Sequence, residues 1–268
     1  MIELVTYIGL GVAAGLLAGL LGVGGGIVIV PMLTFTFAAQ GLPPEHIQHL
    51  ALGTSLATII FTSVASLRAH HARGAVNWPI VRQITPGILL GTFSGAWFAA
   101  ALSGNLLKIF FIIFTFFVAW QMLSSALPKA SRQTPGRFGL FGTGSLIGVI
   151  SSLVGIGGGS MSVPFLIWCN QNARVAIGTS AAIGFPIALS GAAGYLLNGL
   201  NASGLPPYSL GFIYLPALAG IAITSYLTAP LGARLAHNLP IPKLKKGFAI
   251  LLVATGCKML YGLFQELQ

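Results

Sequence analysis

The chain has 268 residues, of which 55% are hydrophobic and only 6% are charged, and its mean hydropathy is +0.90. Soluble domains carry about 25% charged residues, so this composition excludes an ordinary soluble domain and indicates a protein whose surface faces lipid. The net charge of +10 arises from basic residues between apolar segments, a pattern of membrane topology rather than of nucleic-acid binding. Cys169 and Cys257 are the only cysteines, which excludes a disulfide framework and a clustered cysteine metal site.

Eight apolar segments follow in chain order, and they form two series of four. The first segment, 4–39, is broken by the run Gly22–Gly26, and the fifth, 138–168, is broken by the run Gly155–Gly159. The other segments are 47–67, 78–102, 106–127, 175–197, 208–236 and 247–264. The element Gly-Thr-Ser occurs at 53–55 and again at 178–180. We therefore predict an internal duplication, with a first repeat at 1–127, a cytoplasmic linker at 128–137 and a second repeat at 138–268.

The distribution of lysine and arginine indicates how the two repeats are oriented. If the second broken segment enters the membrane and returns to its own side, eleven of the 13 Lys and Arg residues are cytoplasmic, against seven if it crosses. The positive-inside rule favours the returning segment, which leaves only Lys108 and Lys258 toward the outside. By symmetry the first broken segment also returns, and both termini lie outside. The prediction is an all-α polytopic membrane protein with two inverted-topology repeats, each a glycine-broken helical hairpin plus three transmembrane helices.

The two glycine breaks are the candidate substrate site. Flexible backbone at membrane depth is costly unless it lines a cavity or is packed in protein, and paired broken segments indicate the substrate site of transporters. Helices that begin at the breaks point N–H groups and positive dipole ends toward them, which suits an anion. The alternative is that the glycines only allow close helix packing. The candidate residues are Gly24, Gly25, Gly26, Gly157, Gly158 and Gly159.

Four hydroxyl groups near the breaks are further candidates. Thr54, Ser55, Thr179 and Ser180 lie one to two turns into their predicted helices, where they can donate hydrogen bonds to substrate oxygens. The alternative is that each hydroxyl bonds the carbonyl of the preceding turn, as is common in membrane helices.

Three more residues are candidate accessory groups. Ser160 follows the second break, whereas Gln121 and Lys258 occupy matching positions in the last segment of each repeat. Lys258 either attracts the anion or extends its ammonium group to the nearby interface. The three acidic residues lie near segment ends, so we expect no carboxylate proton relay inside the spans. No nucleophile–base pair is visible, and we expect no enzymatic activity, cofactor or metal.

A family resemblance rests on the glycine motifs and their neighbours. The residues that carry it are Gly22-Val-Gly-Gly-Gly with Val30-Pro31, their copy at 155–164, and Gly-Thr-Ser at 53–55 and 178–180. These motifs resemble those of the TauE/SafE family, also called the 4-toluene sulfonate uptake permease family, over essentially the whole chain. The resemblance implies a multi-pass protein of the bacterial inner membrane that moves sulfite, a sulfonate or a related sulfur-containing anion.

The hypothesis that joins these observations is a secondary transporter that moves a small anion by alternating access. Its expected partners are the anionic solute and the lipid bilayer, without nucleic acid, and the sequence indicates no oligomeric state. One alternative is a channel-like anion facilitator, which differs from a carrier in saturation and turnover. Another is a membrane assembly or thiol redox factor that uses Cys169 and Cys257.

Overall fold

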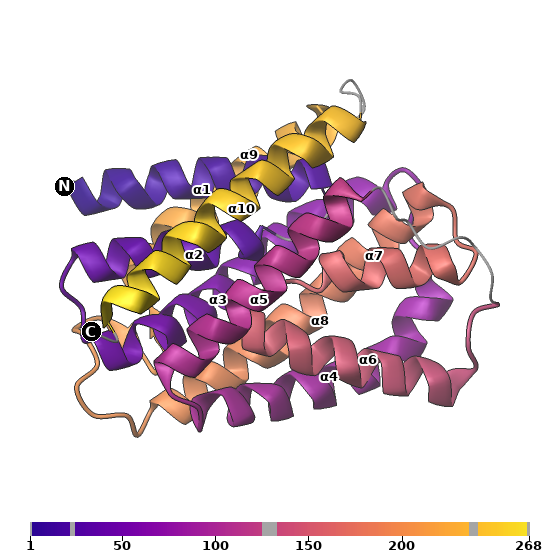
Figure 1. The fold of residues 1–268 in the computed structure, drawn as a ribbon. Helices are drawn as coiled ribbons and strands as arrows, with labels where there is room; N and C mark the ends of the chain where they lie inside the picture. The colour runs from indigo at the N-terminus through magenta and orange to yellow at the C-terminus, as the bar shows by residue number, and fades with distance from the viewer. Residues whose placement is uncertain (1, 22–24, 125–132, 236–240, 267–268) are drawn as a thin grey trace.

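The structure is a computed structural model, and it describes residues 2–21, 25–124, 133–235 and 241–266 (Figure 1). Within these ranges the chain forms ten α-helices and one two-stranded hairpin, which confirms the all-α prediction. The helices are α1 (Ile2–Leu21), α2 (Gly26–Ala39), α3 (Pro44–His71), α4 (Trp78–Ala100), α5 (Gly104–Leu123), α6 (Arg137–Val154), α7 (Gly159–Trp168), α8 (Ala173–Gly199), α9 (Leu215–Leu235) and α10 (Ile241–Glu266).

Six of the described helices, α3, α5, α6, α8, α9 and α10, are long and apolar enough to span a membrane. The apolar stretches of α3 and α8 are 72% and 78% buried, against 33% to 44% for the other four. The centre of the bundle is therefore formed by α3 and α8, and the surrounding helices expose one side to lipid. The 23 residues of α4 are long enough to span, but its glycine, serine and threonine residues lower its hydropathy.

Both broken segments are helical hairpins. The Tyr7 hydroxyl, in the second turn of α1, donates to Oε1 of Gln40 at the end of α2 (2.9 Å), so the first hairpin returns to the end where it began. The second helices of the hairpins, α2 and α7, have 14 and 10 residues. At 1.5 Å per residue they measure about 21 and 15 Å, short of the roughly 30 Å hydrocarbon core. The breaks therefore lie in the interior of the bundle.

The first helix of each hairpin packs along a helix from the other half of the chain. Figure 1 shows α1 beside α9 and α6 beside α4, with α5 beside α10. Glycines permit the close approach. A Cβ added at Gly91 of α4 would collide with the carbonyl oxygen of Ser145 in α6, and one added at Gly15 of α1 would lie 2.6 Å from that of Ser225 in α9. Small residues bring membrane helices together in this way.

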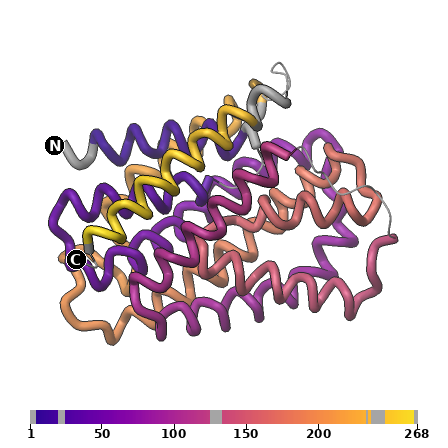
Figure 2. The backbone as a smooth tube through the Cα atoms, in the orientation of Figure 1, coloured from indigo at the N-terminus to yellow at the C-terminus, as the bar shows by residue number. Residues whose placement is uncertain are grey.

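The connections between helices gather at two opposite ends of the bundle (Figure 2). One end holds the start of α1, the end of α10 and the loops 40–43, 101–103 and 200–214, and there Nε2 of His46 lies 2.9 Å from the carbonyl oxygen of Ser203. The opposite end holds the loops 72–77, 133–136 and 169–172, where the Asn77 side-chain amide donates to Oε1 of Gln171 (3.3 Å). Most arginines of the described helices lie near this second end.

One predicted apolar segment is divided in the structure. Residues 208–236 begin with a hairpin in which β1 (Ser209–Leu210) pairs antiparallel with β2 (Ile213–Tyr214), and α9 starts only afterwards. Tyr208 and Gly211 have φ values of 66° and 56°, which a continuous right-handed helix does not allow. Of the predicted linker, residues 128–132 lie outside the described residues, and 133–136 are non-helical backbone before α6.

Candidate functional site

The two glycine breaks have the same backbone geometry. Gly25 precedes α2 with φ 76° and ψ −16°, and Gly158 precedes α7 with φ 75° and ψ −7°. These left-handed values carry no Cβ penalty in glycine. The Gly25 carbonyl accepts from the amides of Val28 and Ile29 (both 3.0 Å), and the Gly158 carbonyl accepts from two amides of its own helix at 3.0 and 2.8 Å. Each break therefore directs the amino end of a short helix into the bundle; Gly24 lies outside the described residues.

The two breaks touch each other. A Cβ added at Gly26 would collide with the carbonyl oxygen of Gly155 and would lie 2.9 Å from Cα of Ile156. Gly155 itself has φ 70° and lies against Leu52 of α3 and Val30 of α2. All residues from Gly155 to Ser160, including the predicted Gly157 and Gly159, are buried. The described parts of the predicted glycine sites thus come together in one closed region.

The glycine and threonine of each Gly-Thr-Ser element contact the segment that leads into a helix of the other half. A Cβ at Gly53 would collide with the carbonyl oxygen of Phe212, and the Thr54 hydroxyl accepts from the backbone amide of Tyr214 (2.9 Å) just before α9.

The second copy makes the matching contacts before α4. A Cβ at Gly178 would collide with the carbonyl oxygen of Ala75, and the Thr179 hydroxyl accepts from the backbone amide of Asn77 (2.9 Å). Both threonines are fully buried. Thr179 thereby satisfies the amide of Asn77, which directly precedes α4 and has no acceptor within that helix.

The serines of the same elements connect to the breaks, Ser55 directly and Ser180 through Ser162. The Ser55 hydroxyl donates to the carbonyl oxygen of Gly155 (2.8 Å). Ser180 shares a hydrogen bond with Ser162 (2.7 Å), and Ser162 donates to the carbonyl oxygen of Gly158 (2.9 Å). The hydrogen bonds of the four predicted hydroxyls thus reach other elements rather than their own preceding turns.

Two serine hydroxyls beside the second break have no protein partner among the described residues. They belong to Ser151, which is fully buried, and Ser160, which is 6% exposed. Ser151 Oγ lies 3.5 Å from the position of a Cβ at Gly158, and Ser160 is in the first turn of α7. Buried hydroxyls are normally hydrogen-bonded, so this region has capacity for a polar ligand. Sequence reasoning missed Ser151, although its position one turn before the break was visible.

The other two accessory candidates lie elsewhere in the bundle. Lys258 is on the exposed side of α10, and its ammonium nitrogen lies 4.4 Å from the centroid of the Phe35 ring, a favourable cation–π distance. Gln121 is half-buried in the last turn of α5.

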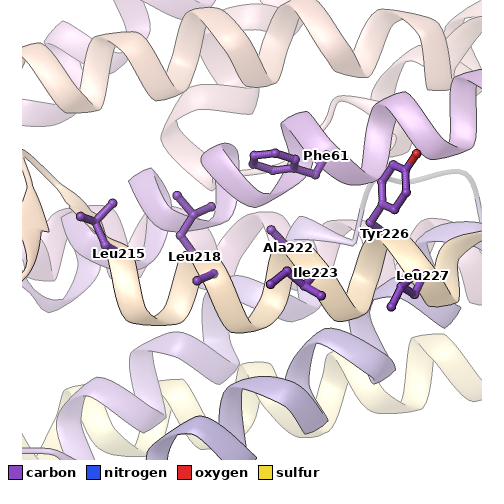
Figure 3. Close-up of a pocket in the computed structure, with 8 residues that line it drawn as sticks. Phe61, Leu215, Leu218, Ala222, Ile223, Tyr226 and Leu227 are labelled. Carbon is purple, nitrogen blue, oxygen red and sulfur yellow. The ribbon is translucent and has the colours of Figure 1, made fainter.

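An apolar cavity lies on the side of the bundle between α3 and α9 (Figure 3). It has a volume of about 580 Å³, and its labelled lining residues are Phe61, Leu215, Leu218, Ala222, Ile223, Tyr226 and Leu227. Its lining is almost entirely apolar, so it does not suit a small charged solute. Within the described ranges the side chains hold no group of three metal-ligating residues, and Cys169 and Cys257 are not joined by a disulfide.

The comparisons with known proteins identify the family. A family model described as sulfite exporter TauE/SafE matches residues 7–259. The chain belongs to this family. It is 39% identical over 250 residues to a "Probable membrane transporter protein" of Haemophilus influenzae, covering 93% of this chain and 95% of the relative.

More distant relatives also align along nearly their whole length. The chain is 26% identical over 283 residues to YunE of Bacillus subtilis, covering 97% and 98% of the two chains. It is 28% identical over 254 residues to a relative from Methanocaldococcus jannaschii, covering 93% and 92%. Both relatives are named "Probable membrane transporter protein". No solved structure matches the chain. The family and the six apolar helices identify a multi-pass membrane protein of a transporter family, not of an enzyme family, which confirms the resemblance.

Proposed function

We propose that the protein is a secondary transporter that carries a small anion, of the sulfite or organosulfonate class, across the cytoplasmic membrane by alternating access. The observation that carries this proposal is the pair of left-handed glycines, Gly25 and Gly158, each of which starts a short helix at a buried break. An anion between these helices would meet backbone N–H groups and positive dipole ends. The family description, sulfite exporter, supports the sulfur-containing class.

The binding site in this proposal comprises both breaks and the hydroxyls around them. Gly24–Gly26 and Gly157–Gly159 supply amides, and the Ser151 and Ser160 hydroxyls can donate to anion oxygens because neither has a protein partner among the described residues. Thr54 and Thr179 hold the surrounding helices through the amides that they accept. In this proposal the second break, of which residues 155–160 are all buried, is closed to both sides until the two halves move.

The proposed motion is that of two inverted repeats moving against each other. In support, α1 begins at the end of the bundle that holds both termini, whereas α6 begins at the opposite end (Figure 2). Each of them packs along a helix of the other half of the chain. Rocking of one half against the other would open the breaks first to one side and then to the other. The arginine-rich end is cytoplasmic in this proposal, by the positive-inside rule.

The test is the flux of radiolabelled sulfite into proteoliposomes that contain the purified protein. The proposal expects saturable uptake that is inhibited by unlabelled sulfite, thiosulfate or sulfoacetate, and less by chloride. Uptake that rises linearly with concentration would indicate a facilitator rather than a carrier. Uptake no greater than in empty liposomes, with protein shown to be folded and inserted, would contradict the proposed substrate class.

A further inference from the structure

The apolar cavity between α3 and α9 is open toward the surrounding lipid. Its wall on α9 runs from Leu215 to Leu227, and Phe61 of α3 lies opposite (Figure 3). The side chains of Phe61 and Leu227 are 47% and 65% exposed. Ala219 and Ala222 contribute only methyl groups to the lining, which leaves space between the larger side chains. Lipid chains are as apolar as leucine, so in a membrane a hydrocarbon chain can fill this space.

The dimensions of the apolar cavity match one acyl chain. The twelve residue steps from Leu215 to Leu227 rise about 18 Å along α9, at 1.5 Å per residue. One leaflet provides about 15 Å of hydrocarbon, half of the roughly 30 Å core. The volume of about 580 Å³ lies within the range of about 300–1,000 Å³ that is typical of pockets for small organic ligands. The apolar cavity is therefore about as long as the acyl region of a single leaflet.

A cationic side chain lies at one end of the apolar cavity. Nη1 of Arg68, in the last turn of α3, donates to the hydroxyl of Tyr226 (3.3 Å), and Tyr226 lines the cavity. Both side chains are exposed. A guanidinium group carries five N–H donors, and the tyrosine hydroxyl that accepts from Arg68 can donate its own hydrogen to a further acceptor. Arginine binds phosphate through parallel charge-assisted hydrogen bonds, so this pair suits a phosphate group.

The acidic residues of the chain are far from Arg68. They are Glu3, Glu45 and Glu266. Glu45 is in the first turn of α3, 23 residues before Arg68, which corresponds to about 35 Å along the helix. Glu3 and Glu266 belong to the start of α1 and the end of α10, at the end of the bundle that holds both termini. The anion that complements Arg68 therefore comes from outside the chain, and basic residues at a membrane surface attract anionic lipids.

We propose that the apolar cavity binds one acyl chain of an anionic phospholipid, whose phosphate is held by the Arg68 guanidinium group and the Tyr226 hydroxyl. The lipid belongs to the leaflet at the arginine-rich end of the bundle, because Arg68 is in the last turn of α3 and the cavity extends from Tyr226 toward the start of α9. The proposal does not depend on the transported solute, since this site shares no residue with the glycine breaks.

The experiment is native mass spectrometry of the purified full-length protein in neutral detergent, equilibrated with increasing amounts of phosphatidylglycerol or phosphatidylcholine. The proposal expects one phosphatidylglycerol molecule per chain to bind before any other, and several-fold more tightly than phosphatidylcholine. Glycerophosphoglycerol, which has the same headgroup without acyl chains, should not displace the bound lipid. These two comparisons test the charge of the headgroup and the requirement for the chain separately.

Three variants test the polar end of the site. Arg68→Met is expected to weaken phosphatidylglycerol binding several-fold and to remove the preference over phosphatidylcholine, whereas Arg68→Lys should retain part of it. Tyr226→Phe should weaken binding less than Arg68→Met, because it removes a neutral hydroxyl and leaves the charge. Arg82→Met is the charge control and should leave binding unchanged, since Arg82 is exposed on α4 and does not line the cavity.

A further variant tests the apolar part without removing a polar group. Ala219 lines the cavity and is exposed, so Ala219→Phe places a ring in the space assigned to the acyl chain. It is expected to weaken lipid binding several-fold. Ala254→Phe is the matched control, because Ala254 is exposed on α10 and lies outside the cavity lining; it should bind lipid as the wild type does.

Each result supports or overturns the proposal. Equal affinity for the two lipids, or equal binding by Arg68→Met and Arg82→Met, would overturn it. If Arg68→Met fails to fold, weaker binding in well-folded Ala219→Phe than in Ala254→Phe supports the site, and equal binding refutes it. A mass of two chains that is lost only in Ala219→Phe, without a bound lipid, would assign the cavity to a second copy of the chain instead. Displacement by glycerophosphoglycerol would refute the role of the acyl chain. Sulfite flux is measured separately, so failure of the transport proposal leaves this test unaffected.

Discussion

The contact between the two breaks can be disturbed with a single methyl group. Gly26 is the first residue of α2, and its added Cβ would collide with the Gly155 carbonyl oxygen and approach Cδ1 of Ile59 to 2.8 Å and Cα of Ile156 to 2.9 Å. Two of these three atoms belong to backbone, which cannot move aside without shifting the second break. Gly26→Ala is therefore predicted to push the two halves of the chain apart at the candidate site.

The expected loss of folding free energy in Gly26→Ala can be estimated from the steric contact that it creates. Overpacking of a well-packed interior costs about 1–3 kcal/mol, and a backbone obstacle places Gly26→Ala in the upper part of that range. The residue is helical and its φ is not left-handed, so no conformational penalty adds to the steric term. Gly247→Ala is the matched control, since Gly247 is helical and exposed with no atom within 4 Å of its added Cβ. That control should be neutral or stabilising by up to about 1 kcal/mol.

The assay combines thermal unfolding in detergent with sulfite uptake into proteoliposomes. Gly26→Ala should unfold at a lower temperature than the wild type and transport more slowly. Gly247→Ala should unfold at the wild-type temperature or slightly above it and transport at the wild-type rate. If Gly26→Ala is as stable and as active as Gly247→Ala, the two breaks do not pack as described and the reasoning from their contact is refuted.

Three further changes test other contacts. Ser55→Ala removes the hydrogen bond to the second break and leaves a buried carbonyl oxygen unsatisfied, so thermal unfolding should show a loss of about 1–3 kcal/mol. Thr54→Val and Thr179→Val each remove the hydroxyl that accepts from a backbone amide; denaturation should show a loss of about 1–3 kcal/mol for Thr54→Val and a smaller loss for Thr179→Val, because Asn77 is only half-buried. Cys169→Ala with Cys257→Ser should retain sulfite uptake, since the two cysteines are not joined by a disulfide; abolished uptake in folded protein would favour a thiol redox function.

Matched controls exist for the hydroxyl variants. Ser63→Ala and Thr115→Val remove hydroxyls that bond only the preceding turn of their own helix. They should lower stability less than the variants at the breaks, because their carbonyl acceptors retain helical hydrogen bonds. Equal losses in the controls and in the test variants would show that the contacts between the two halves contribute no specific stability.

The all-helical fold and the positions of the breaks were predictable from sequence because both depend on local signals. Apolar length sets the spans, and consecutive glycines mark the break that places Gly25 and Gly158 in the left-handed region. The family was equally predictable, since its motifs are contiguous. The role of Thr54 was not, because its partner Tyr214 is 160 positions away and lies in the second strand of a hairpin that hydropathy does not distinguish from a helix.

Residues whose candidate role depends on their burial in the folded protein could not be predicted from the sequence either. Ser151 resembles any small residue of a membrane helix until the structure shows its hydroxyl buried beside Gly158, with no partner in the part of the chain that the structure describes. Lys108 reads as a topological charge near a helix end, and only the packing of α2, α3, α5 and α10 shows that it is buried.

The proposal that the anion binds at the two glycine breaks is tested most directly at the second break, by the KM for sulfite uptake of a Ser151→Ala, Ser160→Ala variant. Neither hydroxyl has a protein partner among the described residues, so their removal should leave the unfolding temperature unchanged or raise it. A hydrogen bond to a charged group contributes about 1.5–3 kcal/mol, and loss of even one should raise KM about ten-fold or more. Ser124→Ala, at the exposed end of α5, should leave KM unchanged. An unaltered KM in the double variant, with protein of normal stability, would contradict the assignment of the substrate site to this break.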